Sequence, residues 1–293
     1  MNKGKITIGM TQFACNIDKN VNLDKAEEQI RKAVESGAKI VCTQELFSNT
    51  YFAQTEDITK YDLAEPIDGP TNKRMQALAK ELDIVVVSCF YEYLMAGIYY
   101  NSAAVFDAGG EFLGIYRKHH IPQDRQYNEK YYFTPGDTDY LVFKSKYANF
   151  GVLICWDEWF PEPARILALK GADFIFYPSA IGSEPEFSEF DVSQTWIDAV
   201  KAHGIHNSFY ICANNRVGRE YSKDGNDYID FYGRSFVSDP WGNIIKEGKK
   251  AEEDLIIAEL DLDKIKYARD ILQFHRDRRV DTYGDILKLY IKE

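Results

Sequence analysis

The sequence contains no apolar stretch close to the roughly 20 residues that a membrane-spanning helix requires. Its amino terminus, MNKGKITIGMTQFA, also lacks the long apolar segment and small-residue cleavage site of a secretory signal. From these two absences we expect a cytoplasmic protein that does not associate with membranes. With 45% hydrophobic and 28% charged residues, the composition is typical of a globular protein.

Positive charge is also scarce. The formal net charge is -11, whereas a protein that binds a phosphate backbone needs clustered lysines and arginines to displace counterions. We therefore expect no nucleic acid partner.

Cysteines are few and irregularly spaced. The chain has five, an odd number, with no CxxC pair, and this pattern indicates reduced thiols instead of a disulfide framework. Cys42, Cys89 and Cys212 lie within apolar runs, where a free cysteine usually serves as a small core residue. His203 and His206 have no third ligand at the spacing of a zinc site, so we expect no metal.

The sequence shows no internal repeat, low-complexity linker or shift in composition that would mark a domain boundary. We expect one domain over residues 1–265 and a carboxy-terminal extension over residues 266–293. The extension contains basic residues together with aromatic and aliphatic ones. That mixture is consistent with either a solvated tail or a subunit contact.

Short apolar runs alternate with helical patterns along most of the chain. This order predicts an α/β fold whose strands are covered on both faces. Turn signals at residues 109–110 and 239–242 predict hairpins, and hence mixed sheets. The runs that predict strands are 6–12, 39–46, 84–90, 102–106, 150–156, 173–179 and 209–215, and the patterns that predict helices are 20–38 and 69–83.

Polar residues of three chemical types close three of these apolar segments. Glu45 ends KIVCTQEL, Lys118 follows the hairpin strand in GIYRK, and Cys155 ends FGVLIC shortly before Pro161. Taken singly, each fits a surface or core residue. Taken together, they fit a thiol nucleophile, a base that removes its proton and a cation that favours the thiolate. If the strand ends meet at one edge, the site is that of a cysteine hydrolase without histidine.

A cysteine and histidine pair is the alternative, since it is the more common arrangement. His119 and His120 directly follow Lys118, and His203 and His206 lie in a predicted helix. Nothing in the spacing excludes one of them as the base.

Three segments resemble the carbon-nitrogen hydrolase, or nitrilase, superfamily: TQELF with Glu45, YRKHHIP with Lys118, and ICWDEWFPEPAR with Cys155. The resemblance extends over nearly the whole chain, from ITIGMTQ to LIIAELDL. It implies a four-layer α-β-β-α sandwich of two mixed sheets, with Cys155 on a tight elbow after its strand. It also implies a homo-oligomer built from dimers, with the carboxy-terminal extension at a subunit interface, and no cofactor.

Within the superfamily, YRKHHIPQDRQYNEKYYFTPGD and FYPSAIGSEPEF are most similar to the branch of N-carbamoylputrescine amidases. That resemblance implies hydrolysis of a small carbamoylated amine to putrescine, carbon dioxide and ammonia, a step of polyamine biosynthesis. The β-ureidopropionase, N-carbamoyl amino acid hydrolase and ω-amidase branches share the three catalytic residue types and remain alternatives. A non-catalytic protein that binds partners through its tail would be expected to have lost one of the three.

The resemblance assigns a role to each catalytic candidate. Cys155 is expected to be the nucleophile and Glu45 the base, while Lys118 and the backbone N–H of Trp156 stabilise the oxyanion. Glu129 is expected to hold Lys118 charged and oriented.

The far end of such a substrate carries an ammonium group, which requires carboxylates or aromatic faces. Glu184 is the predicted ammonium ligand, and Tyr51 and Trp159 are predicted to line the aliphatic chain. A substrate with a carboxylate would instead require an arginine, for which Arg125 and Arg216 are candidates.

Overall fold

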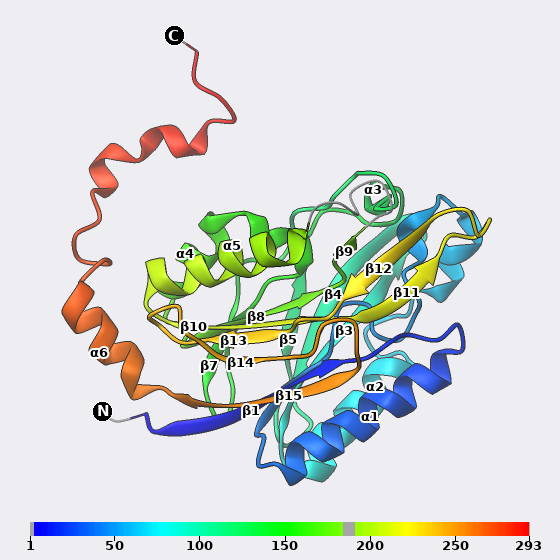
Figure 1. Cartoon of the computed structure of the whole chain (residues 1–293), viewed down its shortest axis with the longest axis horizontal. Helices are drawn as coiled ribbons and strands as arrows, with labels where there is room; N and C mark the ends of the chain where they lie inside the picture. The colour runs from blue at the N-terminus through cyan, green and yellow to red at the C-terminus, as the bar shows by residue number, and fades with distance from the viewer. Residues whose placement is uncertain (1–2, 184–190, 293) are drawn as a thin grey trace.

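The computed structural model describes residues 3–183 and 191–292. The described chain forms a layered body from which the carboxy-terminal segment extends (Figure 1). Within those ranges, no helix combines the length and the apolar character needed to cross a membrane.

The first sheet has six strands in the order β15-β1-β2-β3-β4-β5. Strands β1, β2 and β3 are parallel, while β15 and the β3-β4-β5 meander pair antiparallel. The sheet is therefore mixed, as the predicted hairpin at residues 109–110 requires. Its strands are β1 (Lys5–Gln12), β2 (Ile40–Cys42), β3 (Val85–Met95), β4 (Ile98–Phe106), β5 (Phe112–Arg117) and β15 (Asp254–Asp261).

The second sheet also has six strands, in the order β14-β13-β10-β8-β7-β6. Its centre, β7, β8 and β10, is parallel, and its outer strands pair antiparallel. The predicted hairpin at residues 239–242 joins β13 and β14. The strands are β6 (Val142–Lys144), β7 (Asn149–Val152), β8 (Phe174–Ser179), β10 (Tyr210–Asn215), β13 (Phe236–Ser238) and β14 (Ile244–Glu247).

A small third sheet was not predicted. Strand β12 (Tyr228–Tyr232) lies between β11 (Val217–Tyr221) and β9 (Gly182–Ser183), with antiparallel pairing on both sides. The β11-β12 hairpin begins directly after the central strand β10, so the small third sheet is joined to the second sheet by the chain at this point.

Helices cover the outer face of each large sheet (Figure 1). Helix α1 (Lys19–Glu35) is capped by the Asp18 side chain, and α2 (Pro70–Leu82) begins at a proline that suits the first turn. The apolar faces of α1 and α2 pack on the first sheet in one core cluster. Helices α4 (Pro161–Leu169) and α5 (Val192–Asn207) cover the second sheet.

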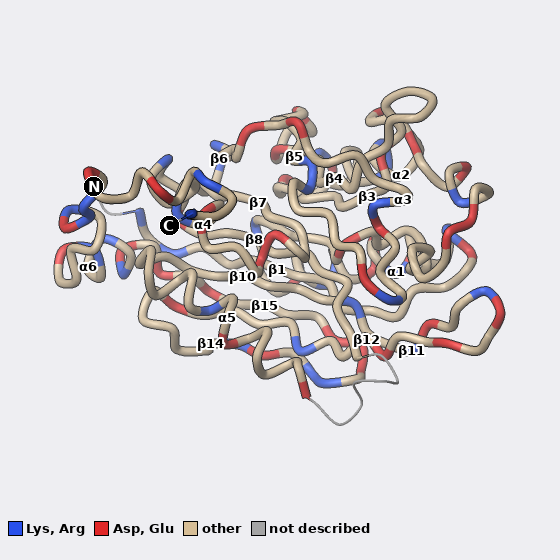
Figure 2. The backbone as a smooth tube through the Cα atoms, turned by 90° about the horizontal axis from the view of Figure 1, so that it is seen from above, with Lys and Arg blue, Asp and Glu red and all other residues tan. Residues whose placement is uncertain are grey.

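The two sheets face each other over a common apolar core. The resulting order is helix, sheet, sheet, helix, which confirms the predicted four-layer α-β-β-α sandwich. Charged residues lie mainly in the helices and loops, and the strands of the large sheets carry few (Figure 2). Burying each large aliphatic side chain of this core contributes about 1.5–3 kcal/mol.

Two predicted strands are too long. The run 39–46 forms a strand only over Ile40–Cys42, and the run 150–156 only over Asn149–Val152. Leu46 and Cys155 adopt left-handed φ angles of 47° and 45°. Both strands end before these positions, and a strand cannot resume through such a residue, so the chain continues as a turn outside each sheet.

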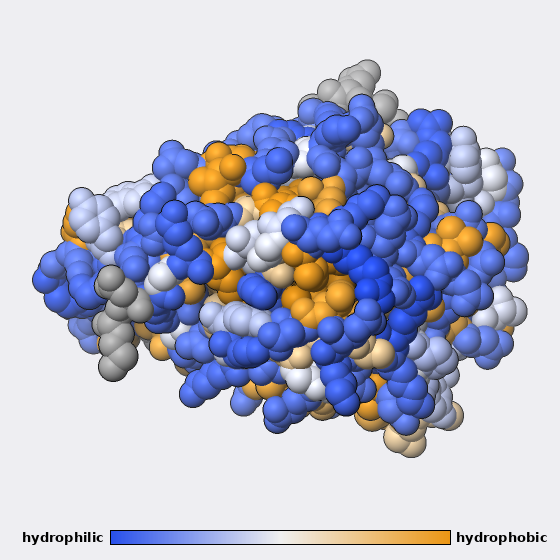
Figure 3. Space-filling model, turned by 90° about the horizontal axis from the view of Figure 1, so that it is seen from below, coloured by the Kyte–Doolittle hydropathy of each residue, from blue (hydrophilic) through white to orange (hydrophobic). Residues whose placement is uncertain are grey.

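The carboxy-terminal segment starts as helix α6 (Asp263–Leu272) and continues as two short 3-10 turns, η5 (Val280–Thr282) and η6 (Gly284–Leu287). It extends away from the layered body (Figure 1). Leu287 and Leu289 are 90% and 99% exposed. Elsewhere, on the face seen in Figure 3, hydrophobic residues form separate patches in a mainly hydrophilic surface.

Candidate active site

The structure brings Glu45, Lys118 and Cys155 to one buried place between the two large sheets. Glu45 follows β2, Lys118 follows β5 and Cys155 follows β7. The side chains of Glu45 and Lys118 are fully buried, and Cys155 is 4% exposed. Lys118 Nζ lies 2.9 Å from Glu45 Oε1. Burial and the charge of Glu45 raise the pKa of the Cys155 thiol, and the charge of Lys118 opposes them.

Lys118 lies between two carboxylates. Besides Glu45, its Nζ donates to Glu129 Oε2 at 2.7 Å. Burial alone would lower the pKa of the Lys118 ammonium, but Glu129 and Glu45 outweigh it and raise the pKa well above its usual value. Lys118 is therefore held as a charged, oriented ammonium.

Glu129 begins the short helix α3 (Glu129–Tyr132) and is itself buried. Burial raises the pKa of its carboxyl, the charge of Lys118 opposes this shift, and Glu45 adds to it. The Tyr51 hydroxyl donates to Glu129 Oε1 at 2.6 Å. Both oxygens of Glu129 are thus engaged, and Tyr51 belongs to the support of Lys118.

Glu45 has one engaged oxygen and one open oxygen. Its Oε1 accepts a hydrogen bond from Asn101 Nδ2 at 2.6 Å as well as the one from Lys118. Its Oε2 is buried and has no hydrogen-bond partner among the described residues. A carboxylate held through one oxygen can take a proton on the other, as a general base requires. Asn101 was not predicted, although a polar residue within the apolar run of β4 is a signal that could have pointed to it.

Cys155 occupies the elbow after β7, at the start of the 3-10 turn η3 (Cys155–Trp159). A left-handed φ is unfavourable for a residue with a side chain and is often retained at functional sites. Burial and the Glu45 carboxylate raise the pKa of the thiol well above its usual value, although Lys118 opposes them. At neutral pH the free thiol therefore keeps its proton and depends on a base to lose it.

Asp157 joins the elbow to the segment that carries Lys118, and it was not predicted. This buried carboxylate accepts the N–H of Ile154 at 2.9 Å and the hydroxyl of Tyr116 at 2.7 Å on Oδ2. Its Oδ1 accepts the backbone N–H of His120 at 3.0 Å and lies 2.7 Å from His120 Nδ1. Tyr116 and His120 flank Lys118, so one carboxylate sets the elbow relative to the lysine.

The histidines considered as alternative bases have other partners. Besides the contact of His120 with Asp157, His119 Nε2 lies 2.6 Å from the Thr138 carbonyl. His203 Nδ1 lies 2.8 Å from the Tyr177 hydroxyl, and burial followed by the charge of His206 lowers the pKa of His203 to about 4. His206 is exposed on α5. These contacts do not favour a cysteine and histidine pair.

The residues predicted to stabilise the oxyanion and to bind the substrate differ in their exposure and surroundings. Trp156 is 37% exposed, with its ring at a surface hollow of about 540 Å³ beside the elbow. Trp159 is partly buried, and its ring makes an edge contact with that of Trp156 at 6.4 Å between centroids. Glu184 lies outside the described residues.

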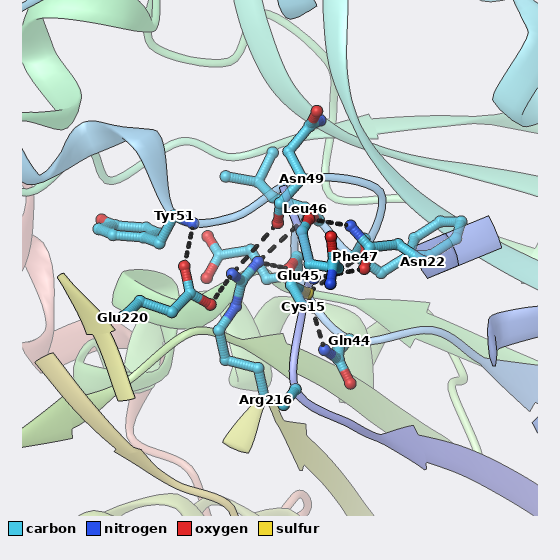
Figure 4. Close-up of polar contacts among 12 residues, drawn as sticks. Cys15, Asn22, Gln44, Glu45, Leu46, Phe47, Asn49, Tyr51, Arg216 and Glu220 are labelled. Carbon is cyan, nitrogen blue, oxygen red and sulfur yellow. Dashed lines mark hydrogen bonds and ion pairs between the residues drawn. The ribbon is translucent and has the colours of Figure 1, made fainter. Parts of the chain in front are cut away.

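The two candidate arginines differ in setting. Arg125 is partly exposed and pairs with Asp227 at 3.1 Å. Arg216 is fully buried and donates to Glu220 and to backbone carbonyls, including those of Glu45 and Leu46 (Figure 4). Because these groups occupy its guanidinium, Arg216 is not the carboxylate receptor that we considered. Within the described ranges, no three His, Cys, Asp or Glu side chains are grouped as metal ligands.

Comparison with known proteins agrees with this geometry. The family model for carbon-nitrogen hydrolase matches residues 7–270. An N-carbamoylputrescine amidase of Oryza sativa subsp. japonica is 45% identical over 97% of this chain and 95% of its own length. A citrullinase of Francisella tularensis is 39% identical, over 97% and 99% of the two chains.

A solved structure extends the likeness to three dimensions. The crystal structure of a carbon-nitrogen hydrolase from Helicobacter pylori G27 superposes with a TM-score of 0.94 at 36% identity, covering 98% of this chain and 100% of that one. Both the sequence and the fold of the whole body are therefore shared with hydrolases of this kind. The chain belongs to the carbon-nitrogen hydrolase family.

Proposed function

We propose that the chain hydrolyses N-carbamoylputrescine to putrescine, carbon dioxide and ammonia, with Cys155 as nucleophile. The observation that carries the proposal is the buried cluster of Glu45, Lys118 and Glu129 around this thiol. Its chemistry is that of an amidohydrolase. The substrate follows from the 45% identity to an N-carbamoylputrescine amidase along nearly the full chain.

The first step is attack on the ureido carbon. Glu45 takes the thiol proton on its open Oε2, and Cys155 Sγ forms a bond to the carbon. The former carbonyl oxygen becomes an oxyanion. It is stabilised by the charge of Lys118, which two carboxylates hold in place, and by the N–H of Trp156.

The second step releases the amine. Glu45 returns its proton to the putrescine nitrogen, because an amine leaves poorly unless it is protonated. The carbon-nitrogen bond breaks, and a carbamoyl thioester remains on Cys155. Glu45 then activates a water molecule that hydrolyses the thioester to carbamate, which decomposes to carbon dioxide and ammonia. The step requires no cofactor.

Recognition of the distal ammonium remains a prediction. Glu184 is still proposed for it and Trp159 for lining the aliphatic chain, while Tyr51 is reassigned to the support of Glu129. Arg216 has no free donor pair for a substrate carboxylate, which favours a cationic over an anionic substrate. Citrulline carries both charges and is the second candidate, because a citrullinase is 39% identical to the chain.

Steady-state kinetics test the proposal. The values of kcat/KM should be highest for N-carbamoylputrescine when it is compared with citrulline, N-carbamoyl-β-alanine and glutaramate. Cys155→Ala, measured at the same protein concentration, is the control for contaminating activity. Equal or faster turnover of an anionic substrate would contradict the proposed substrate, and preference for citrulline would support the second candidate.

For the assembly, we propose a homo-oligomer of dimers in which the extension 266–293 forms a subunit contact. The support is the exposed apolar side chains at its end, including Leu287, Leu289 and Ile291. The double variant Leu287→Asp and Leu289→Asp should lower the mass measured by analytical ultracentrifugation, whereas Lys292→Asp should not. An unchanged mass in the double variant would favour a solvated tail. The cytoplasmic location also stays a prediction.

A further inference from the structure

The segment that carries Glu45 needs support from outside itself. Residues 45–51 leave the first sheet after β2 and form no strand, and Leu46 adopts a left-handed φ of 47°. The carbonyls of such a buried turn have no sheet partners and must find other donors. Because the proposed base is the first residue of this turn, the donors also decide where its side chain lies.

A single arginine supplies most of these donors (Figure 4). Arg216 Nη2 donates to the carbonyls of Glu45 at 2.8 Å and Leu46 at 3.2 Å. Its Nη1 donates to the carbonyl of Asn49 at 3.3 Å. One guanidinium therefore holds three peptide groups of the turn through a planar fork of five donors, a geometry that the three donors of a lysine ammonium do not reproduce.

Glu220 completes the arrangement at the other end of the segment. Its Oε1 accepts from Arg216 Nη1 at 2.8 Å, and the carboxylate neutralises the buried charge. Its Oε2 accepts the backbone N–H of Tyr51 at 2.5 Å. The ion pair thus holds the carbonyl of Glu45, where the turn starts, and the N–H of Tyr51, where it ends (Figure 4).

The pair is anchored in a different part of the fold. Arg216 lies between β10 and β11, its N–H donates to the Ser179 carbonyl at 3.3 Å, and its carbonyl accepts the N–H of Gly233. Its guanidinium packs 5.3 Å from the ring centroid of Phe231. A turn of the first sheet is therefore fixed to the second sheet and to the β11-β12 hairpin.

We propose that Arg216 and Glu220 are positioning residues for the reaction: they set the main chain of Glu45 so that Oε2 faces the thiol, and that of Tyr51 so that its hydroxyl reaches Glu129. Glu129 in turn holds Lys118. The pair therefore controls both the base and the support of the cation without contacting substrate. The inference rests on the proposed function only through the role given to Glu45.

The test compares Arg216→Met and Arg216→Lys with Arg219→Met. Arg219 lies in β11, three residues further along the chain, and is also paired with a carboxylate, Asp230, at 2.7 Å, but it is 45% exposed and has no hydrogen bond to a catalytic candidate within the described ranges. Arg216→Met should lower kcat about 100-fold with little change in KM, because a shift of about 1 Å at a catalytic group has that effect. Arg216→Lys should be intermediate, and Arg219→Met should match the wild type.

A second readout does not depend on the substrate. Alkylation of Cys155 by iodoacetamide, followed by peptide mass spectrometry against pH, should be fast near neutral pH in the wild type, because Glu45 takes the proton. In Arg216→Met, as in Glu45→Gln, the rate should be low at neutral pH and still rise at high pH. Methylguanidinium, at a concentration that does not denature the protein, should restore part of the rate in Arg216→Gly.

The outcomes separate the two claims. If the wild type hydrolysed none of the ureido compounds, the proposed function would fail, and the alkylation profiles would still decide whether Arg216 positions Glu45. If Arg216→Met does not fold, Glu220→Gln is assessed in the same way, with an expected loss of about 10-fold because the amide still accepts from Tyr51. Folded variants of Arg216 or Glu220 with wild-type kcat and alkylation profiles would overturn the inference.

Discussion

The turns that carry the proposed base, Glu45, and the proposed nucleophile, Cys155, share a backbone feature and are held by residues of opposite charge. Each follows a parallel strand, β2 or β7, and each contains a left-handed residue with a side chain, Leu46 or Cys155. The base turn is held by a buried cation, Arg216, that donates to its carbonyls. The nucleophile turn is held by a buried anion, Asp157, that accepts the backbone N–H of Ile154.

The two anchoring residues also differ in their sequence separation from the turn that each one holds. Arg216 is 171 residues from Glu45 in the sequence, whereas Asp157 is only three residues from Ile154. The elbow is therefore set largely by local chain geometry and by its link to Lys118, while the base turn depends on the correct docking of the second sheet. We expect changes that disturb the packing of the two sheets to displace the turn of Glu45 before they displace the elbow of Cys155.

The largest effect is expected from removing the nucleophile itself. Cys155→Ser should lower kcat at least about 1,000-fold, because a hydroxyl is a much weaker nucleophile than a thiol. The thermal unfolding midpoint should change little, since serine is nearly isosteric and the thiol has no hydrogen bond to lose among the described residues. A fully active Cys155→Ser would refute the mechanism.

Breaking the elbow anchor should have the next largest effect. In Asp157→Asn one acceptor oxygen becomes an NH₂ group, so two of the contacts to Ile154, Tyr116 and His120 are lost. We expect a loss of about 1–3 kcal/mol in unfolding free energy and a fall of kcat of about 10- to 100-fold. Urea unfolding and steady-state kinetics measure the two effects.

Combining Asp157→Asn with Arg216→Met tests whether the two turns are stabilised independently. The two anchors have no shared hydrogen-bond partner among the described residues, so their stability losses should add within about 0.5 kcal/mol. A large coupling in the double variant would show that the two turns form one structural unit.

The smallest effect is expected at Glu158, which is adjacent to Asp157 but accepts fewer hydrogen bonds. Glu158 is buried, its Oε2 accepts from the Ser179 hydroxyl at 3.0 Å, and its Oε1 has no partner among the described residues. Burial raises the pKa of its carboxyl to about 8. The folded protein therefore binds this proton more tightly than the unfolded chain does, and stability falls as pH rises from about 4.5 to about 8.

Glu158→Gln should remove this dependence. Relative to the wild type, the variant should gain stability progressively over the same pH window and show its full advantage above pH 8. Thermal melts at several pH values provide the measurement. A difference between variant and wild type that does not depend on pH would show that the pKa of this carboxyl is not raised in the fold.

Much of this arrangement was predictable from local pattern. The alternation of apolar runs and helical patterns predicts the α/β layers, and the residue types that end three runs predict the Glu45, Lys118 and Cys155 cluster. Each signal lies within one segment. Whether the segment ends meet is decided by the topology of the sheets, which places Lys118 in contact with Glu45.

What was missed depends on contacts between distant segments. No propensity marks the left-handed residues Leu46 and Cys155 in the turns after β2 and β7, and the roles of Asn101 and Arg216 follow from the meeting of separate segments. Tyr51 looked like a pocket wall because its hydroxyl partner, Glu129, is 78 residues away. Such pairings are set by tertiary packing and leave no periodic trace in the sequence.

The central claim is that Cys155 forms a carbamoyl thioester, and trapping it tests this most directly. When hydroxylamine is present during turnover of N-carbamoylputrescine, its nitrogen should attack the thioester carbon and release the Cys155 thiol. The product should be hydroxyurea, formed at the expense of ammonia. Carbon-13 at the ureido carbon should appear on Cys155 after an acid quench. Turnover with neither hydroxyurea nor labelled Cys155 would contradict the mechanism.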